Sequence, residues 1–564
     1  MWINYLDQAL LLAALAVSVN LLVGYAGQVS VAHAAFAGVG GYTVCFLAGE
    51  HGWPYLASLA VAVLVATAFG VVIGLIALGL AQEFLILMTL AFSLGIIGVF
   101  ATFDSLGGVM GLTGVDGLRL FGFELDGPSD WLIPSAVVLV LVFAVCHRLG
   151  ESPYGRVLKG IREDTVATRA LGKNTFGRKV GIFAITSGLT GLVGGVYSGW
   201  LGQATPSAFG FPLAMAVFAM VIVGGNANLV GSVVAGAVLT MIEPVLREVL
   251  GVQSTQAALW QVVLYGALLV LVMIVRPQGL FPERSKRVAP PATARAKVTP
   301  RSPSGPVAYA DAEVVLRAEG LSKRFGGITA AKDIALELRR GTITALVGPN
   351  GAGKTTAFNL LTGTVVPDTG SVRLNGAELV EMRPDLIVRA GLVRTFQDVR
   401  LLDRLTCLEN VMLAVPDQPG ERLGRLFVPG RGVSRADRAV AARAMEWLDF
   451  VGMADHAGTP ADALSYGQSK LVSLARALAT RADVLLLDEP ASGVDATWVE
   501  TMLAMVAAVR DEGRTVCLVE HNLDVVRELS DHTYFMELGE ITASGTLAEL
   551  TGSARLAEAY FGAQ

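Results

Sequence analysis

The chain has 564 residues, of which 53% are hydrophobic and 16% charged, and its formal net charge at pH 7 is −5. Charge is distributed unevenly: residues 1–310 hold 17 basic and 14 acidic side chains, whereas residues 311–564 hold 26 and 34. An average soluble domain is about 25% charged, so the composition excludes a single globular domain and a disordered chain. It predicts a membrane part followed by a soluble part, and nothing in it indicates a nucleic-acid partner.

Long uncharged runs predict an all-α polytopic domain in a lipid bilayer over residues 1–282. A helix needs about 20 apolar residues to cross a bilayer, and uncharged runs occupy residues 54–82, 84–103, 131–146, 180–242 and 249–275. With the stretches 10–23 and 29–48 added, and the run 180–242 divided into three, we expect about nine segments. Glycine pairs inside them predict broken or re-entrant helices around a path through the protein.

Loop charge predicts the orientation of these segments. Residues 148–179 carry eight Arg or Lys and three acids, and residues 276–301 carry seven and one, so both should face the cytoplasm. Residues 104–130 carry one Arg and five acids and should lie outside. Nine segments then place the N-terminus outside a bacterial cytoplasmic membrane. Residues 1–20 lack the basic start of a signal peptide, so we expect the first segment to be retained.

Isolated polar residues inside the apolar segments are candidates for a substrate path, because each is costly in lipid and usually faces the bundle interior. The best group is Asn20, Gln28, Ser30 and His33. Two alternatives stay open. Asn, Gln and Ser can bond to neighbouring backbone where a Gly-rich helix breaks, and His33 can be a packing residue.

The basic loop 153–179 places apolar residues at near-helical intervals between charges, which predicts short amphipathic helices at the cytoplasmic surface. Such helices could lie on lipid or dock on a soluble domain as a coupling loop. The soluble half of the chain favours the second interpretation, because it supplies a domain on which the loop can dock. The residues that we assign to this coupling loop are Gly155, Ile161, Glu163, Leu171 and Gly172.

Residues 283–310 contain five prolines, six basic residues and one acid, which predicts a semi-extended tether between two domains. The second domain, residues 311–564, should be an α/β nucleotide-binding domain. Residues 343–347 predict a buried strand, and residues 348–356 fit G-x-x-x-x-G-K-[ST], a loop whose backbone N–H groups cradle phosphates. The residues concerned are Gly348, Asn350, Gly351, Gly353, Lys354, Thr355 and Thr356. Lys354 should reach the β and γ phosphates and Thr355 should bind Mg²⁺.

A second apolar strand, residues 484–488, ends in an acidic pair. Asp488 can hold Mg²⁺, and Glu489, one residue on, can polarise the attacking water. Residues 464–468, LSYGQ, open a helical run in which Ser465, Tyr466, Gly467 and Gln468 can present hydroxyl and backbone N–H groups to a phosphate.

Together these motifs resemble the ATPase domain of the ABC transporters. The resemblance adds Gln397 as a Mg²⁺ and coupling residue, Asp495 as the D-loop acid, His521 as a γ-phosphate contact and Phe325 as the aromatic that stacks on adenine. It also implies that LSYGQ serves the ATP of a second cassette. The signature is followed by Ser469 and Lys470, where the family generally has Gln and Arg.

The subgroup that the chain resembles is the branched-chain amino acid importers. The motifs concerned in the soluble half are GPNGAGKTT, RTFQDVRLLDRLTCLENV and AEAYFG, and in the membrane half residues 20–43, 111–118 and 276–281. The resemblance implies a natural fusion of permease and ATPase that imports branched-chain or related hydrophobic amino acids with ATP and Mg²⁺. Implied partners are a second permease and a second ATPase, or a second copy, and an extracytoplasmic substrate-binding protein. A urea or short-amide importer, an exporter half and a non-transporting tethered ATPase are the alternatives.

Overall fold

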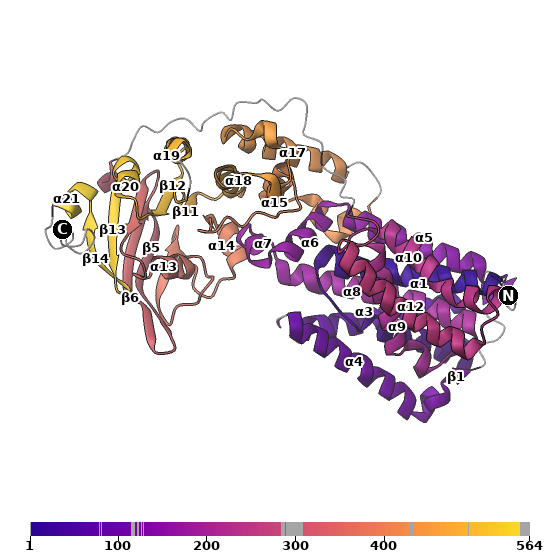
Figure 1. Ribbon diagram of the computed structural model, residues 1–564. Coiled ribbons are helices and arrows are strands. Elements are labelled where there is room, and N and C mark those ends of the chain that lie inside the picture. The colour runs from indigo at the N-terminus through magenta and orange to yellow at the C-terminus, as the bar shows by residue number, and fades with distance from the viewer. Residues whose placement is uncertain are drawn as a thin grey trace. The chain divides into compact units, whose positions relative to one another are not determined.

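The computed structural model describes residues 2–77, 79, 82–113, 119, 120, 123–125, 127, 129–283, 288, 308–428, 432–493 and 496–552 (Figure 1). The chain forms two compact units, one of Met1–Arg162 with Thr175–Lys286 and one of Glu163–Asn174 with Arg287–Gln564. Residues 163–174 of the basic loop therefore belong with the second unit. Asp495, most of the tether, residues 114–118 and the AEAYFG motif lie outside the described residues.

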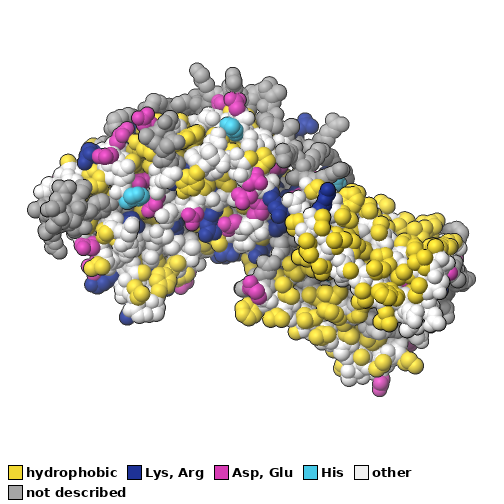
Figure 2. All heavy atoms as spheres, viewed as in Figure 1, with side chains coloured by type: hydrophobic (Ala, Val, Ile, Leu, Met, Phe, Trp, Pro, Cys, Tyr) yellow, Lys and Arg dark blue, Asp and Glu magenta, His cyan; other side chains and the backbone are white. Residues whose placement is uncertain are grey.

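The first unit is helical, and its surface is largely apolar (Figure 2). Its helices are α1 Trp2–Asn20, α2 His33–Val44, α3 Tyr55–Ala77, α4 Gln82–Thr102, α5 Leu132–Gly150, α6 Pro153–Glu163, α8 Thr175–Leu201, α9 Phe211–Gly224, α10 Leu229–Thr240, α11 Ile242–Pro244 and α12 Ser254–Val275. The π-helical turns η1 Leu21–Tyr25, η2 Cys45–Glu50 and η6 Val245–Val249 extend α1, α2 and α11. The two-residue strands β1 Leu112–Thr113 and β4 Gln203–Ala204 pair antiparallel, as do β2 Arg119–Leu120 and β3 Phe123–Glu124.

Eight helices among the described residues are long and apolar enough to cross a membrane, one fewer than the nine segments expected. The difference lies in residues 29–48. The backbone leaves the helix at Gly27, whose φ of 67° is left-handed, and becomes helical again only at His33. The α-helical part, α2, has 12 residues and continues as the π-helical turn η2 to Glu50. Because Ala26, Gln28 and Ser30 are buried, this irregular backbone is enclosed by protein rather than lipid.

Glycines bring α2 and α8 into close contact. A Cβ on Gly40 would lie 2.0 Å from the carbonyl oxygen of Gly191, and one on Gly194 would lie 1.9 Å from that of Ala37. Small residues let helix backbones approach in this way inside membrane proteins. The broken segment is thus fixed against one of the longest helices of the unit.

The second unit has two sheets. One is antiparallel, in the order β6-β5-β8-β9. The other has the order β10-β11-β12-β7-β13-β14, and all its neighbouring pairs are parallel except β13–β14, which is antiparallel. The strands are β5 Val314–Phe325, β6 Ile328–Arg339, β7 Ile343–Val347, β8 Thr369–Leu374, β9 Ala377–Glu378, β10 Leu392–Arg394, β11 Val484–Asp488, β12 Thr515–Val519, β13 His532–Glu537 and β14 Glu540–Gly545. The helices are α7 Thr165–Ala170, α13 Lys354–Leu361, α14 Pro384–Ala390, α15 Cys407–Ala414, α16 Leu423–Leu426, α17 Gly432–Phe450, α18 Tyr466–Ala479, α19 Ala496–Asp511, α20 Leu523–Leu529 and α21 Leu547–Thr551.

Strands β7, β11 and β12 are buried along their whole length, as their apolar sequences predict for parallel strands covered on both faces. Leu346, Leu486 and Val519 join residues of the antiparallel sheet in one core. The carboxyl ends of these strands meet at one edge of the sheet, where ligands bind in open α/β folds. The four cysteines, Cys45, Cys146, Cys407 and Cys517, are free and buried.

Candidate functional site

The loop 348–353 joins β7 to α13 and carries the predicted phosphate-binding residues. Gly351 and Gly353 have φ of 82° and 102°, and a Cβ on Gly353 would lie 2.5 Å from the carbonyl oxygen of Ala330. Only glycine adopts such a path without strain. Asn350, Gly351 and Thr355 are exposed, Gly348 is buried, and Thr356 is half-buried in the first turn of α13. The loop therefore presents backbone and hydroxyl groups at a helix N-terminus.

Lys354 is the first residue of α13, directly after this loop. It is buried, and its Nζ donates hydrogen bonds to the carbonyl oxygens of Gly348 at 2.7 Å and Pro349 at 3.0 Å. Burial lowers the pKa of Lys354, and the nearby carboxylates of Glu489 and Asp488 counteract that shift. The ammonium is thus held by the loop carbonyls within the electrostatic field of the predicted base Glu489 and the predicted Mg²⁺ ligand Asp488.

Asp488 ends β11 and forms a buried ion pair with Arg394, the last residue of β10. Nη2 of Arg394 lies 2.6 Å from Oδ2 of Asp488, and both side chains are almost fully buried. Nη1 of Arg394 also donates to Oδ1 of Asn359 at 2.5 Å. Burial raises the pKa of Asp488, and Arg394 opposes that shift. The pair fixes the carboxylate at the strand end.

Glu489 has a left-handed backbone, with φ of 47°. For a residue with a Cβ this conformation costs about 1–2 kcal/mol, and such strain concentrates at active sites. Its Oε2 accepts a hydrogen bond of 3.0 Å from Nε2 of Gln397, and its Oε1 lies 3.8 Å from Nδ1 of His521. The structure thus brings the three predicted catalytic residues together from loops that follow β11, β10 and β12.

Glu520 is a part of this site for which the motifs assign no role. It is 1% exposed, and its carboxylate accepts hydrogen bonds from the backbone N–H groups of Ala491 at 3.0 Å and His521 at 3.3 Å. Burial raises the pKa of Glu520. The signal was present in the sequence, since Glu520 directly follows the apolar strand β12 as Glu489 directly follows β11.

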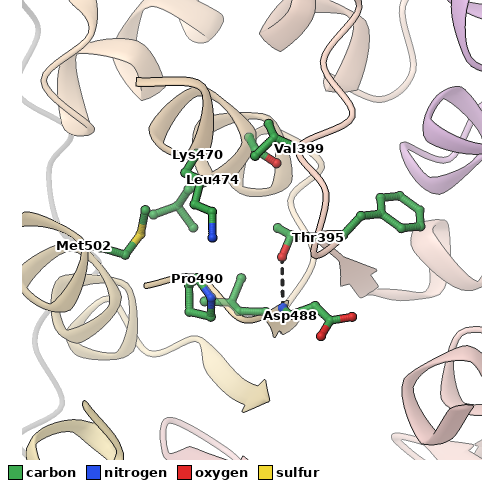
Figure 3. A pocket seen from close by; sticks show the side chains of 10 residues that line it. Thr395, Val399, Lys470, Leu474, Asp488, Pro490 and Met502 are labelled. Carbon is green, nitrogen blue, oxygen red and sulfur yellow. Dashed lines mark hydrogen bonds between the residues drawn. The ribbon is translucent and has the colours of Figure 1, made fainter. Parts of the chain in front are cut away.

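A cavity adjoins the acidic pair, between the end of β11, α18 and α19 (Figure 3). Its lining residues are Thr395, Phe396, Val399, Lys470, Ser473, Leu474, Leu487, Asp488, Pro490 and Met502. The backbone N–H of Asp488 donates to Oγ1 of Thr395 at 3.3 Å. Figure 3 shows the Lys470 side chain extending from its helix toward Pro490.

The signature residues begin α18. Ser465 caps the helix, accepting from the N–H of Gln468 at 3.3 Å while Oε1 of Gln468 accepts from the N–H of Ser465 at 3.0 Å. Gly467 packs on the ring of Trp498, which a Cβ would approach to 2.9 Å. Ser465 and Tyr466 are exposed, so this helix start can meet a ligand from outside the unit. Phe325, at the end of β5, is also half-exposed, as a base-stacking ring must be.

Comparison with known proteins shows the family of the chain. Residues 1–273 match the family model "Branched-chain amino acid transport system / permease component", and residues 331–492 match "ABC transporter". The high-affinity branched-chain amino acid transport ATP-binding protein LivG of Salmonella typhimurium is 36% identical over 249 residues, which are 44% of this chain and 98% of LivG. The chain belongs to the ABC transporter family.

Further similar proteins match the ATP-binding part. BraF of Pseudomonas aeruginosa, a high-affinity branched-chain amino acid transport ATP-binding protein, is 36% identical over 253 residues, 44% of this chain and 98% of BraF. A solved nucleotide-free ATP-binding cassette from an ABC transporter is 30% identical and covers 44% of this chain and 100% of that one, with a TM-score of 0.40.

This ABC transporter chain joins a permease to an ATP-binding cassette, which confirms the predicted fold class and fusion. The cassette binds ATP and hydrolyses it in support of transport. The permease makes the chain a multi-pass membrane protein.

The polar residues of the permease lie in two environments. Nδ2 of Asn20 donates to the carbonyl oxygens of Gly225 and Asn228 and to Ser232, at 3.0, 3.2 and 2.6 Å, and its Oδ1 accepts from the N–H of Ala227 at 2.9 Å. These contacts match the alternative that this side chain bonds to backbone where a helix breaks. Asn20 fastens α1 to the turn between α9 and α10.

Gln28, Ser30 and His33 lie on and after the broken stretch. The amide of Gln28 is buried and makes no side-chain hydrogen bond within the described part of the chain. His33 packs against Phe183, with Nε2 3.4 Å from Oγ1 of Thr186. Ser30 and His33 line a small cavity whose other walls are apolar, from α1, α2 and α9.

The predicted coupling loop is divided between the two units. Gly155 and Ile161 are buried in α6 with the permease, whereas Glu163, Leu171 and Gly172 group with the cassette. The backbone N–H of Arg404 donates to Oε2 of Glu163 at 3.2 Å, and Nε of Arg389 donates to the carbonyl oxygen of Gly172 at 3.2 Å.

Proposed function

We propose that this chain is the fused permease and ATPase subunit of an importer for branched-chain or related hydrophobic amino acids. The family model of the permease part and the names of LivG and BraF support this class of substrate. The observation that carries the ATPase part of the proposal is the placement of Glu489, which Gln397 and His521 approach at the strand edge beside the phosphate loop.

The residues present fit a magnesium ion. The hydroxyl of Thr355, the carboxylate of Asp488 and the side-chain oxygen of Gln397 are the hard oxygen donors that Mg²⁺ prefers. When bound, the ion neutralises charge on the β and γ phosphates. Lys354 would contact the same phosphates, with Phe325 stacked on the adenine.

In the proposed hydrolysis step, a carboxylate oxygen of Glu489 accepts a proton from the attacking water. The water oxygen bonds to the γ phosphorus while the bond from that phosphorus to the bridging oxygen breaks, which leaves ADP and phosphate. His521 donates a hydrogen bond to the γ phosphate. Gln397 holds Glu489 in place through the 3.0 Å bond.

The cassette has its signature at the exposed start of α18, which supports head-to-tail pairing with a second cassette. In that arrangement Ser465 and Gly467 of one cassette contact the ATP held by the phosphate loop of the other. The full assembly would comprise two permeases and two cassettes, either from a second copy or from separate chains. An extracytoplasmic binding protein would deliver the amino acid.

Contacts inside the permease support an extracytoplasmic N-terminus. Nη1 of Arg162, at the end of α6, donates to the carbonyl oxygen of Gly24 at 2.6 Å, and the hydroxyl of Tyr25 lies 3.5 Å from Glu151. The C-terminal ends of α1 and α5 therefore lie together, next to the start of the coupling loop. With the cassette in the cytoplasm, α1 begins on the opposite side of the membrane.

The proposed site is tested with Glu489→Gln in the purified full assembly. The amide keeps the shape but accepts no proton, so ATP should bind with an unchanged Kd while the rate of hydrolysis falls by about 100-fold or more. Turnover within a fewfold of the unmodified protein would remove Glu489 from the role of base.

The substrate is tested separately in liposomes with the binding protein. ATP-dependent uptake should be found for leucine, isoleucine or valine and should be lost in Glu489→Gln. Uptake of urea or short amides with no uptake of these amino acids would contradict the proposed substrate class while leaving the ATPase assignment intact.

A further inference from the structure

Lys470 links the signature helix to the backbone of the predicted base. It lies one turn after Tyr466 on α18, and it is buried, with 6% of its surface exposed. Its Nζ donates a hydrogen bond of 2.6 Å to the carbonyl oxygen of Glu489 and lies 5.2 Å from the centre of the Tyr466 ring. One side chain thus contacts both the signature and the residue that ends the catalytic strand.

The bond falls on a residue whose backbone needs support. Glu489 is left-handed, and its N–H donates to the carbonyl oxygen of Val519 at 2.9 Å. The N–H is therefore fixed by β12, the side chain by Gln397 and the carbonyl by Lys470. A strained conformation persists only where its surroundings hold it. Of these three contacts, the one from Lys470 comes from the signature helix α18.

A buried ammonium at this place is a costly choice unless acids surround it. Asp488, Glu489 and Glu520 are close enough to stabilise its charge. Figure 3 shows that the side chain reaches across the cavity from α18 rather than folding back along its own helix. An apolar side chain could fill the same volume without this cost, but it could not donate the hydrogen bond to Glu489. That hydrogen bond is therefore what a lysine adds at this position.

We infer that Lys470 is a positioning residue, which makes the orientation of Glu489 depend on the signature helix of the same cassette. The inference rests on the proposed function, in which Glu489 is the base and α18 meets the ATP of a second cassette. Contact between the signature and that ATP would then orient Glu489, the base of the first ATP site, through Lys470.

The test compares Lys470→Met, Lys470→Arg and Ser473→Ala in the full assembly. Met removes the donor and keeps much of the length, so kcat for ATP hydrolysis should fall about 10- to 100-fold while KM and the Kd for ATP change little. Arg restores a donor and should recover most of the rate. Ser473 lines the same cavity on the same helix, and its replacement should leave kcat unchanged.

The decisive measurement repeats Lys470→Met in the Glu489→Gln background. A residue that acts through Glu489 has no further effect once the base is gone, so the residual rate should not fall again. An equal fall in both backgrounds, or an unchanged kcat in the single variant, would overturn the inference. A fast Glu489→Gln enzyme would instead overturn the proposed role of Glu489, so the two failures can be told apart.

Discussion

Nζ of Lys173 lies 2.6 Å from Oε1 of Glu421, and the two side chains are only 4% and 8% exposed. Lys173 also donates to the carbonyl oxygen of Val415 at 2.9 Å. Lys173 belongs to the coupling loop, whereas Glu421 and Val415 follow α15 in the cassette. Breaking a buried pair of this kind leaves an uncompensated charge, at a cost of about 3–5 kcal/mol. The pair therefore fastens the coupling loop to the cassette.

Lys173→Met should uncouple transport from hydrolysis. We expect amino acid uptake to fall at least about 10-fold while basal ATP hydrolysis stays within about twofold, since a loss of this free energy weakens docking but leaves the ATP site intact. Uptake and phosphate release are measured in the same liposomes. Glu313→Gln is the control, because its pair with Arg340 is exposed and contributes little. Normal uptake by Lys173→Met would contradict the fastening role, whereas partial recovery in the exchanged pair Lys173→Glu, Glu421→Lys would support it.

Arg394→Met should destabilise the cassette by about 3 kcal/mol, because the buried carboxyl group of Asp488 would be left without its partner. The thermal transition of the cassette in the full chain, followed by calorimetry, should move down by several degrees. The control Arg373→Met breaks an exposed contact with Glu378 and should leave the transition in place. Equal shifts in the two variants would show that the buried pair of Arg394 and Asp488 contributes no more to the stability of the cassette than the exposed pair.

The sequence predicts the ATP-site motifs well because each one is local. Gly351, Gly353 and Lys354 act through the backbone of a single loop, so their spacing alone specifies the phosphate cradle. Arg394 and Lys470 are different. Each contacts an active-site residue that is remote in sequence, Asp488 or Glu489, through packing of strands and helices, and no spacing rule connects them.

The permease shows a second limit, which concerns where a helix begins. Hydropathy treats residues 29–48 as one apolar segment, but the left-handed Gly27 and the buried stretch after it delay the start of the helix to His33, from which it runs through α2 and η2 to Glu50. The cost of non-helical backbone in lipid is avoided because neighbouring helices enclose it. That enclosure is a tertiary property, which a sliding window along the chain does not contain.

Asn20 and Gln28 should respond differently to the same substitution. Asn20→Leu breaks four hydrogen bonds and leaves backbone groups unsatisfied, each costing about 1–3 kcal/mol, so the detergent-solubilised permease should lose thermal stability. Gln28→Leu removes a buried amide without a side-chain hydrogen bond in the described residues and should keep or raise stability. Uptake kinetics then separate the roles: a changed KM in Gln28→Leu supports a substrate path there. Equal stability of the two variants would contradict the structural role of Asn20.

Glu520 should give the cassette a specific pH dependence. Burial raises its pKa above the ordinary value of 4.5, so between that value and the raised pKa the folded state holds a proton that the unfolded state has lost. Stability from this group is therefore fully present below pH 4.5 and is lost as pH rises through the raised pKa, by at most about 1.4 kcal/mol per pH unit. Glu520→Gln lacks this dependence, so the stability of the unmodified protein relative to the variant should fall as pH rises. Unfolding free energies of both proteins between about pH 5 and pH 8, with exposed Glu319→Gln as the control, measure the difference. A difference that stays constant with pH would show that burial does not shift the titration of Glu520.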